Sequence, residues 1–355
     1  MQEFRSPQLI GYGFSPERAR WARDNKKLLT LRVETSLKCN LACNYCGHFR
    51  RAKNEITYER IISVIDQASK LGAESIIIIG GGEPTIYPNF KDLILHIRSH
   101  NMVPVIFTNT VTMSEGLAHF LYENNVSVIG KLDSLKVEVQ DRIAGKKGTS
   151  QQIQMGIKNL MNAGFTRTED PFKLRLGLSF VISKENIDEL PALWRFCRER
   201  GIFPNLEMMV PDRRAANLIN LIPTKEEWES AKLQLLKIDQ DEFGFDWLPY
   251  TPLLGSGCLQ TFYSLFLTVE GYIWPCAGIQ IEEFNIDEYT LEEVINLPLF
   301  ELTRHIDLHL KGKCNSCKYI NKCVGCRGMA FNLARLRGES ILDAVCAEDP
   351  TCFRR

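Results

Sequence analysis

Short runs rich in valine, isoleucine and leucine alternate with amphipathic stretches of helical period through residues 31–210. The run IIII at 76–79, for example, is followed by a helical pattern over 89–101 and a second apolar run at 103–108. Strands become apolar on both faces when helices cover both sides of a parallel sheet. About six such units predict an α/β fold, a partial (β/α)6 TIM-like barrel whose ligands sit at the carboxyl ends of the strands.

The pattern changes after this region. Residues 223–239 predict one more helix, and 241–257 are aromatic and rich in turn residues. Two short apolar runs and a dense group of cysteines follow. We therefore expect a helical extension at 1–30, the barrel at 31–237, and a small cysteine-rich α+β domain at 238–355.

Charge and hydropathy exclude several classes of protein. Among 355 residues, 43 lysines and arginines balance 43 aspartates and glutamates. A neutral chain gives no electrostatic reason to expect a nucleic-acid or membrane partner. The chain shows neither the apolar core of a secretory signal nor the roughly 20 consecutive apolar residues of a membrane span. We expect a cytoplasmic protein.

The 12 cysteines fall into two groups. Three lie at 39–46, eight lie at 258–352, and Cys197 stands alone on an apolar helix face, as a buried free thiol would. In a reducing compartment, clustered cysteines more often bind metals or catalyse reactions than form disulfides. The distribution predicts two metal-binding regions joined by a metal-free body.

The first group, Cys39, Cys43 and Cys46, has the spacing Cx3Cx2C directly after a predicted strand. Three thiolates can hold three irons of a four-iron cluster and leave the fourth iron open to an outside ligand. The alternative is a zinc knuckle with His48 as the fourth ligand.

Polar and glycine-rich segments follow several other strands. The turn Gly80-Gly81-Gly82-Glu83-Pro84 lets the backbone approach a ligand and offers a carboxylate, although such a turn alone is a weak signal. Further candidates, for each of which a capping or turn role is equally open, are Asn109, Asp133 and Glu207.

Together, Cx3Cx2C and GGGEP resemble the signature motifs of the radical S-adenosylmethionine superfamily. The resemblance implies a [4Fe-4S] cluster on Cys39, Cys43 and Cys46 whose open iron is chelated by the methionine moiety of S-adenosylmethionine. One electron then cleaves the sulfonium, and the 5′-deoxyadenosyl radical abstracts a hydrogen atom.

The same resemblance implies contacts to the nucleotide. Tyr45 would lie near the adenine, and the turn at 80–84 would hold the methionine amino group. Family members often have Ser-Leu-Asp where this chain has Lys131-Leu132-Asp133, a departure that affects the expected ribose contact. The implied cofactor-binding residues are Tyr45, Gly81, Gly82, Glu83, Pro84, Asn109, Asp133 and Glu207.

The second cysteine group follows the pattern Cx12Gx4C, a gap, Cx2Cx5Cx2C, and two further cysteines. Spacing alone also fits a pair of zinc ribbons. The pattern resembles the SPASM extension of radical S-adenosylmethionine enzymes, which implies two auxiliary iron–sulfur clusters. The implied ligands are Cys258, Cys276, Cys314, Cys317, Cys323, Cys326, Cys346 and Cys352.

The tail GCRGMAF…EDPTC resembles the pyrroloquinoline-quinone and heme-maturation branch of the family. That resemblance favours Cys352 over Cys346 as the closing ligand beside Cys314, Cys317 and Cys323. The other cluster would take Cys258, Cys276 and Cys326, with either Cys346 or an open iron in the fourth place. Two residues rather than three separate the last pair, Cys323 and Cys326, which departs from the family pattern.

The leading hypothesis is a radical enzyme that matures a peptide or a peptide-derived or other cofactor precursor. The expected electron donor is a flavodoxin or ferredoxin. An alternative is dehydrogenation or epimerisation of a small molecule such as a sugar alcohol. An alternative of another class is a non-catalytic iron–sulfur electron carrier or zinc scaffold, in which GGGEP and the open three-cysteine site would have no purpose.

Overall fold

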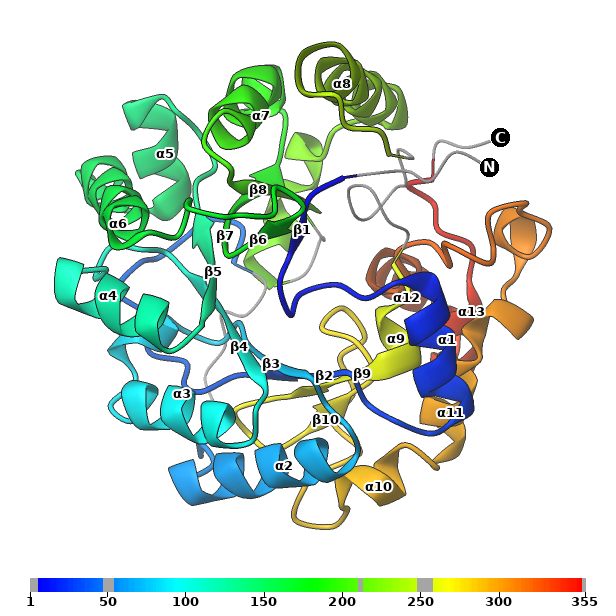
Figure 1. Ribbon diagram of the computed structural model, residues 1–355. Helices are drawn as coiled ribbons and strands as arrows, with labels where there is room; N and C mark the ends of the chain where they lie inside the picture. The colour runs from blue at the N-terminus through cyan, green and yellow to red at the C-terminus, as the bar shows by residue number, and fades with distance from the viewer. Residues whose placement is uncertain (1–5, 47–53, 210–212, 248–257, 353–355) are drawn as a thin grey trace.

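Six parallel strands form the wall of an open barrel (Figure 1). The computed structural model describes residues 6–46, 54–209, 213–247 and 258–352. The six strands are neighbours in the order in which they are named here: β2 (Thr30–Val33), β3 (Ser75–Ile78), β4 (Val103–Thr108), β5 (Ser127–Lys131), β7 (Leu176–Ile182) and β8 (Phe203–Met208). The predicted α/β fold with a partial (β/α)6 barrel is confirmed.

Helices surround this sheet, as Figure 1 shows. In α2 (Tyr58–Lys70), Thr57 caps the first turn, and Ile61, Val64, Ile65 and Ala68 form the buried stripe that helical period predicts. The other barrel helices are α3 (Phe90–Ser99), α4 (Glu115–Glu123), α5 (Val137–Ala144), α6 (Thr149–Ala163), α7 (Leu190–Arg198) and α8 (Lys225–Ile238). Within the described ranges, no helix is long and apolar enough to cross a bilayer.

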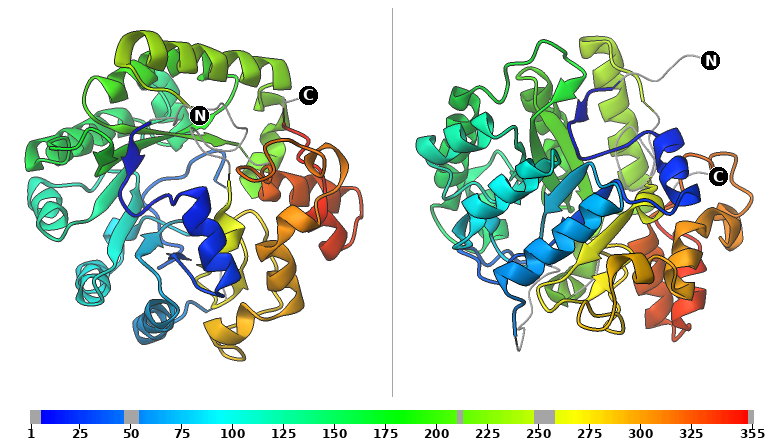
Figure 2. Two further views of the ribbon diagram at one scale, coloured as in Figure 1. Left: turned by 45° about the vertical axis from the view of Figure 1, so that its right-hand side comes forward. Right: turned by 60° about the horizontal axis from the view of Figure 1, so that its bottom comes forward.

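The cysteine-rich region continues the barrel sheet. Strand β9 (Ser264–Leu267) runs parallel to β2, with Phe266 opposite Arg32, and β10 (Ile273–Trp274) returns antiparallel to β9. Figure 2 shows the helices that follow, gathered on one side of the barrel. Those helices, with the short α9 before the hairpin, are α9 (Gln260–Tyr263), α10 (Leu291–Val294), α11 (Pro298–Arg304), α12 (Arg327–Leu336) and α13 (Ile341–Cys346).

The N-terminal segment closes the inside of the barrel. Strand β1 (Gln8–Leu9) pairs with β6 (Lys173–Leu174), and Leu9 and Tyr12 pack on the inward side chains Ile77, Val105 and Ile129. Helix α1 (Pro16–Asp24) then packs against α9. The first helix thus contacts the cysteine-rich region, and the segment before it seals the barrel floor.

A buried carboxylate fastens the last barrel helices together. Asp239, directly after α8, accepts hydrogen bonds at 2.8 Å from the indole nitrogens of Trp194 and Trp247. It also forms a two-pronged ion pair with Arg198, at 2.6 and 2.9 Å. Both partners of this pair are nearly inaccessible to solvent. Because the ion pair and both indole groups converge on one carboxylate, its loss would leave several buried donors without an acceptor.

We expect Asp239→Ala to lower the free energy of unfolding by roughly 3–5 kcal/mol, because Arg198 would become an unpaired buried charge. Urea unfolding followed by tryptophan fluorescence measures this change. The matched control is Glu242→Ala, which removes the partner of the exposed Arg195 and should hardly move the midpoint. Equal midpoints for the two variants would contradict this account of α7 and α8.

Candidate active site

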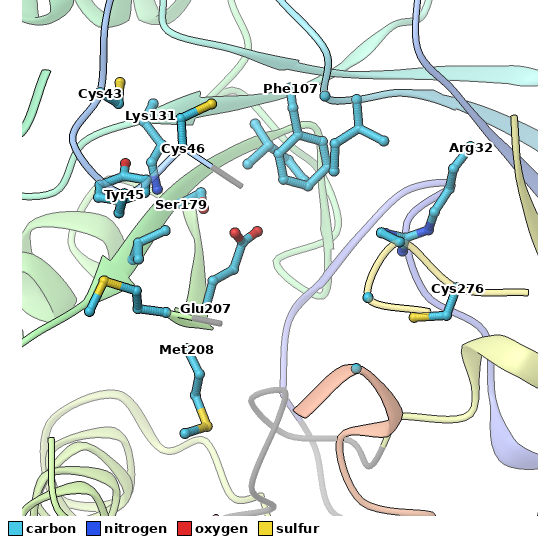
Figure 3. A pocket seen from close by; sticks show the side chains of 18 of the residues that line it. Arg32, Cys43, Tyr45, Cys46, Phe107, Lys131, Ser179, Glu207, Met208 and Cys276 are labelled. Carbon is cyan, nitrogen blue, oxygen red and sulfur yellow. The ribbon is translucent and has the colours of Figure 1, made fainter. Parts of the chain in front are cut away.

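A cavity of about 430 Å³ lies inside the barrel, between the carboxyl ends of its strands and the cysteine-rich region. Cys39, Cys43 and Cys46 line it from the loop after β2. In Figure 3, Cys43, Cys46, Tyr45 and Lys131 lie on one side, and Arg32 and Cys276 lie on the opposite side. The second set of cysteines that line the cavity is Cys258, Cys276 and Cys326. The cavity therefore joins two cysteine trios that are more than 200 residues apart in sequence.

The glycine-rich turn after β3 docks against the backbone that precedes Cys39. The Gly82 amide donates to the Ser36 carbonyl at 2.6 Å, and the Glu83 amide donates to the Lys38 carbonyl at 2.9 Å. A Cβ at position 82 would overlap the Lys38 carbonyl. We expected these glycines to let the backbone approach a ligand, but the close approach that requires Gly82 is to the chain itself.

Helix α5 holds the other end of the cysteine loop. The amides of Ala42 and Asn44 donate to the carbonyls of Ala144 and Ile143, at 3.2 and 3.0 Å. Gly145 ends the helix with φ +69°, and a side chain there would overlap the Ala42 carbonyl. Our sequence analysis missed this support, because Val137 and Val139 alternate with charged residues in the manner of a strand.

Glu83 organises the region around the turn. Its carboxylate, 4% exposed, accepts hydrogen bonds from the Thr85 amide and hydroxyl, the Thr108 hydroxyl at 2.6 Å and the Asn109 amide at 2.7 Å. Burial raises the pKa of Glu83, and these hydrogen bonds oppose the rise. Asn109 in turn donates from its side chain to Asn40 at 2.7 Å. Both residues thus tie the cysteine loop to the end of β4. Pro84, which is itself buried, begins the short turn Pro84–Ile86.

Asp133 fixes the orientation of Tyr45. The Tyr45 hydroxyl donates to Asp133 Oδ2 at 2.8 Å, while Oδ1 accepts from the Val181 amide at 2.8 Å. The Lys131 ammonium lies 3.0 Å from the same Oδ1 and 5.2 Å from the centre of the Tyr45 ring. Lys131, the departure from the family pattern, thus pairs with Asp133, and the carboxylate positions the tyrosine.

Glu207 points into the cavity from the end of β8 (Figure 3). Its Oε1 accepts a hydrogen bond from Asn205 at 2.8 Å, and Oε2 has no partner in the described part of the chain. The carboxylate is half-buried and can accept hydrogen bonds from a ligand.

Five predicted cysteine ligands lie outside the cavity lining. Cys352 contributes to the electrostatic surroundings of both Cys314 and Cys323. Cys346 is buried at the end of α13, and the charges that act on it come from Lys311, Arg327 and Asp343. The predicted ligands that do not line the cavity are Cys314, Cys317, Cys323, Cys346 and Cys352.

Close backbone packing also restricts Gly328, two residues after Cys326. A Cβ at that position would lie 2.9 Å from the Gly278 Cα, so a larger residue there would push the two segments apart.

The pKa values of the thiols and the distances between their sulfurs bear on the kind of metal centre that they can form. Burial raises the pKa of Cys43 to about 12 and that of Cys258 to about 11, so metal binding must displace their protons. Sulfurs around one tetrahedral zinc ion lie about 3.8 Å apart. Among the described residues, no three cysteine sulfurs lie within 4.8 Å of one another. Within each described trio, at least one pair of sulfurs is therefore farther apart than in a closed single-zinc site. His48, the predicted fourth zinc ligand, lies outside the described residues.

Among the described residues, one close group of side chains that could bind a metal ion lies elsewhere, on α2 and at the C-terminal end of α3. His96 and His100 approach the same oxygen of Asp66, at 2.8 and 2.9 Å. Hydrogen bonding to this shared acceptor accounts for the arrangement without a metal.

We expect Gly82→Ala to displace the cysteine loop, because the added Cβ collides with the Lys38 carbonyl. Anaerobic reconstitution should then give roughly four fewer irons per chain, one cluster's worth. Gly116→Ala is the control, because a Cβ at this position in α4 meets no atom within 4 Å. Equal iron contents, in variants with equal circular dichroism, would show that the turn does not hold the loop.

Comparison with known proteins identifies the family of the barrel domain. Residues 33–197 match the family model of the radical SAM superfamily. The AdoMet-dependent heme synthase of Oleidesulfovibrio alaskensis is 22% identical, over 90% of this chain and 85% of its own. The PqqA peptide cyclase of Gluconobacter oxydans is 24% identical, over 91% of each chain.

Among solved structures, Streptococcus suis SuiB bound to S-adenosylmethionine has the same fold, with a TM-score of 0.70 at 19% identity. The match covers 93% of this chain and 80% of SuiB. The matched domain contains Cys39, Cys43 and Cys46, which line the cavity together with cysteines of the C-terminal region. The chain is therefore an enzyme with a radical SAM superfamily domain over residues 33–197, followed by a SPASM-like cysteine-rich region at its C-terminal end.

Proposed function

We propose that this enzyme cleaves S-adenosylmethionine reductively and uses the 5′-deoxyadenosyl radical to take a hydrogen atom from a peptide or a peptide-derived or other cofactor precursor. The observation that carries this proposal is the single cavity lined by both cysteine trios. A substrate bound there would lie between the radical site and an auxiliary centre.

Cys39, Cys43 and Cys46 would hold a [4Fe-4S] cluster, which supplies the electron that cleaves the sulfonium. Tyr45, held by its 2.8 Å hydrogen bond to Asp133, offers a fixed ring against which the adenine can pack. Glu207 would accept hydrogen bonds from the nucleotide or substrate. Gly81, Gly82, Glu83, Pro84 and Asn109 would act near the methionine moiety chiefly by fixing the cysteine loop.

The interior of the barrel is suited to a reactive radical. Tyr12, Phe107 and Ile129 line the deep part of the cavity, and Val181 and Met209 line it farther along the sheet. Apolar walls exclude water and offer few groups for side reactions. These side chains would keep the radical available for the substrate.

The substrate class rests on relatives and on size. PqqA peptide cyclase is named for a peptide substrate, SuiB has also been solved with the precursor peptide SuiA, and the heme synthase is named for a cofactor product. A cavity of about 430 Å³ lies in the lower part of the range for ligand pockets. The nucleotide and the reacting group of the substrate would fill it, with the rest of a longer substrate outside.

The C-terminal cysteines would hold two auxiliary clusters. Cys258, Cys276 and Cys326 would bind one at the cavity. A fourth ligand from Cys346 is disfavoured, because this residue does not line the cavity. The second cluster would take Cys314, Cys317, Cys323 and Cys352, and a flavodoxin or ferredoxin would supply electrons. The domain division at 30 and 237 remains part of this proposal.

We expect Cys43→Ala to abolish formation of 5′-deoxyadenosine from S-adenosylmethionine under dithionite, because one ligand of the radical-site cluster is lost. Chromatography of anaerobic reactions measures the product. Cys197→Ala is the matched control, since this thiol is fully buried in α7 and does not line the cavity. Product formation by Cys43→Ala at the rate of the control would refute the assignment.

Deuterium tracing tests the substrate class. Candidate substrates are a deuterated precursor peptide, a deuterated porphyrin and a deuterated sugar alcohol, each given to the reduced enzyme. We expect deuterium in 5′-deoxyadenosine with the peptide or the porphyrin, because the radical takes a substrate hydrogen. Transfer from the sugar alcohol alone would overturn the proposed class while leaving the radical chemistry intact.

A further inference from the structure

Two buried arginines border the part of the cavity that Cys258, Cys276 and Cys326 line. Arg32 lies in β2 and is 6% exposed, and Arg327 begins α12 and is 3% exposed. Both line the cavity together with Cys258, Cys276 and Cys326. Figure 3 shows the Arg32 side chain on the same side of the cavity as Cys276.

Arg32 has no anionic partner among the described residues. Its Nε and Nη2 atoms are buried and make no hydrogen bond in that part of the chain. The centre of the Tyr12 ring lies 5.9 Å from the guanidinium carbon. Burial raises the pKa of Tyr12 to about 12, so at neutral pH the phenol carries no compensating charge.

Arg327 is held but not neutralised. Its Nη1 donates to the carbonyls of Val345 and Ala347, at 3.1 and 2.7 Å, whereas Nε and Nη2 make no hydrogen bond within the described ranges. Asp349, a buried carboxylate nearby, accepts hydrogen bonds from the Cys326 amide and from Thr351. It forms no ion pair with Arg327 in the described chain.

Both guanidinium groups line the cavity beside the same three sulfurs, those of Cys258, Cys276 and Cys326. A buried cation without a counter-charge is strongly unfavourable, so an anion is expected beside Arg32, where Arg327 adds a second positive charge. An iron–sulfur cluster held by thiolates is such an anion, and its negative charge increases when it accepts an electron.

We propose that Arg32 and Arg327 compensate the charge of the cluster held by Cys258, Cys276 and Cys326 and raise its reduction potential. This inference rests on the auxiliary cluster in the proposed function. Because added negative charge is stabilised by the two cations, the reduced state gains more than the oxidised state. The arginines thereby favour this cluster as an acceptor of electrons that leave the substrate. They are positioning residues, since they act through the cluster.

The test is an anaerobic redox titration followed by electron paramagnetic resonance. The full chain carries alanines at Cys39, Cys43 and Cys46, so that only auxiliary clusters remain. The signal that Cys276→Ser removes identifies the cluster at the cavity. In this background we compare Arg32→Gln, Arg32→Lys and Arg327→Gln, with Arg304→Gln as the control. Arg304 is also buried, but it donates to the carbonyls of Ala22 and Lys27 and does not line the cavity.

We expect Arg32→Gln and Arg327→Gln each to lower the midpoint potential of the cluster by ~59 mV. At the wild-type midpoint potential, this shift lowers the ratio of reduced to oxidised cluster about tenfold for a one-electron couple. Arg32→Lys keeps the charge and should stay near the wild-type value, as should Arg304→Gln. The Arg327 variant gives an independent result if Arg32→Gln does not fold.

Unchanged midpoints in both glutamine variants would overturn the inference and leave a substrate carboxylate as the partner of these arginines. Equal shifts in Arg32→Gln and Arg32→Lys would also overturn it, since packing rather than charge would then be responsible. If the unsubstituted chain shows no signal that depends on Cys276, the auxiliary cluster itself fails. Iron and sulfide counts separate that failure from the failure of the arginine inference.

Discussion

Two backbone hydrogen bonds, from Gly82 to the Ser36 carbonyl and from Glu83 to the Lys38 carbonyl, fix the position of the first cysteine loop. They can form because residue 82 has no side chain, and Glu83 keeps the turn in place by accepting hydrogen bonds from β4 and from Thr85. With the hydrogen bonds to α5 at its other end, the loop is held on both sides, although it has no helix or strand of its own. A radical site requires ligands that already lie close to their final geometry, and these contacts provide it without using the thiols.

The second constraint is the pairing of β9 with β2. This parallel pairing joins segments more than 230 residues apart and brings the cysteines on either side of the hairpin to the barrel interior. One cavity thus receives thiols from both regions, and β2 contributes to each side. The loop after β2 carries the first trio, and Arg32 within β2 lies beside the second. Tyr12 and the N-terminal segment close the floor beneath them.

Local patterns predicted the barrel well, because each β/α unit carries its own periodicity and buries its own apolar stripe. The pairing of β9 with β2 was not predictable in this way, since FYSLFL has the composition of core in any small domain. Helix α5 was missed because its first turn alternates like a strand. Arg32 had a usable signal, because a lone charge in the apolar run LTLRV is costly unless something pairs with it. The sequence singled out the residues of the turn at 80–84, but their contacts to the chain itself depend on the approach of a distant loop, which motif spacing does not encode.

The central claim is that two thiolate trios hold iron at opposite sides of one cavity. Anomalous diffraction at the iron edge, from crystals grown without oxygen, tests it most directly. The account predicts separate iron peaks beside Cys39, Cys43 and Cys46 and beside Cys258, Cys276 and Cys326. Scattering at the zinc edge instead, or iron beside neither trio, would contradict it.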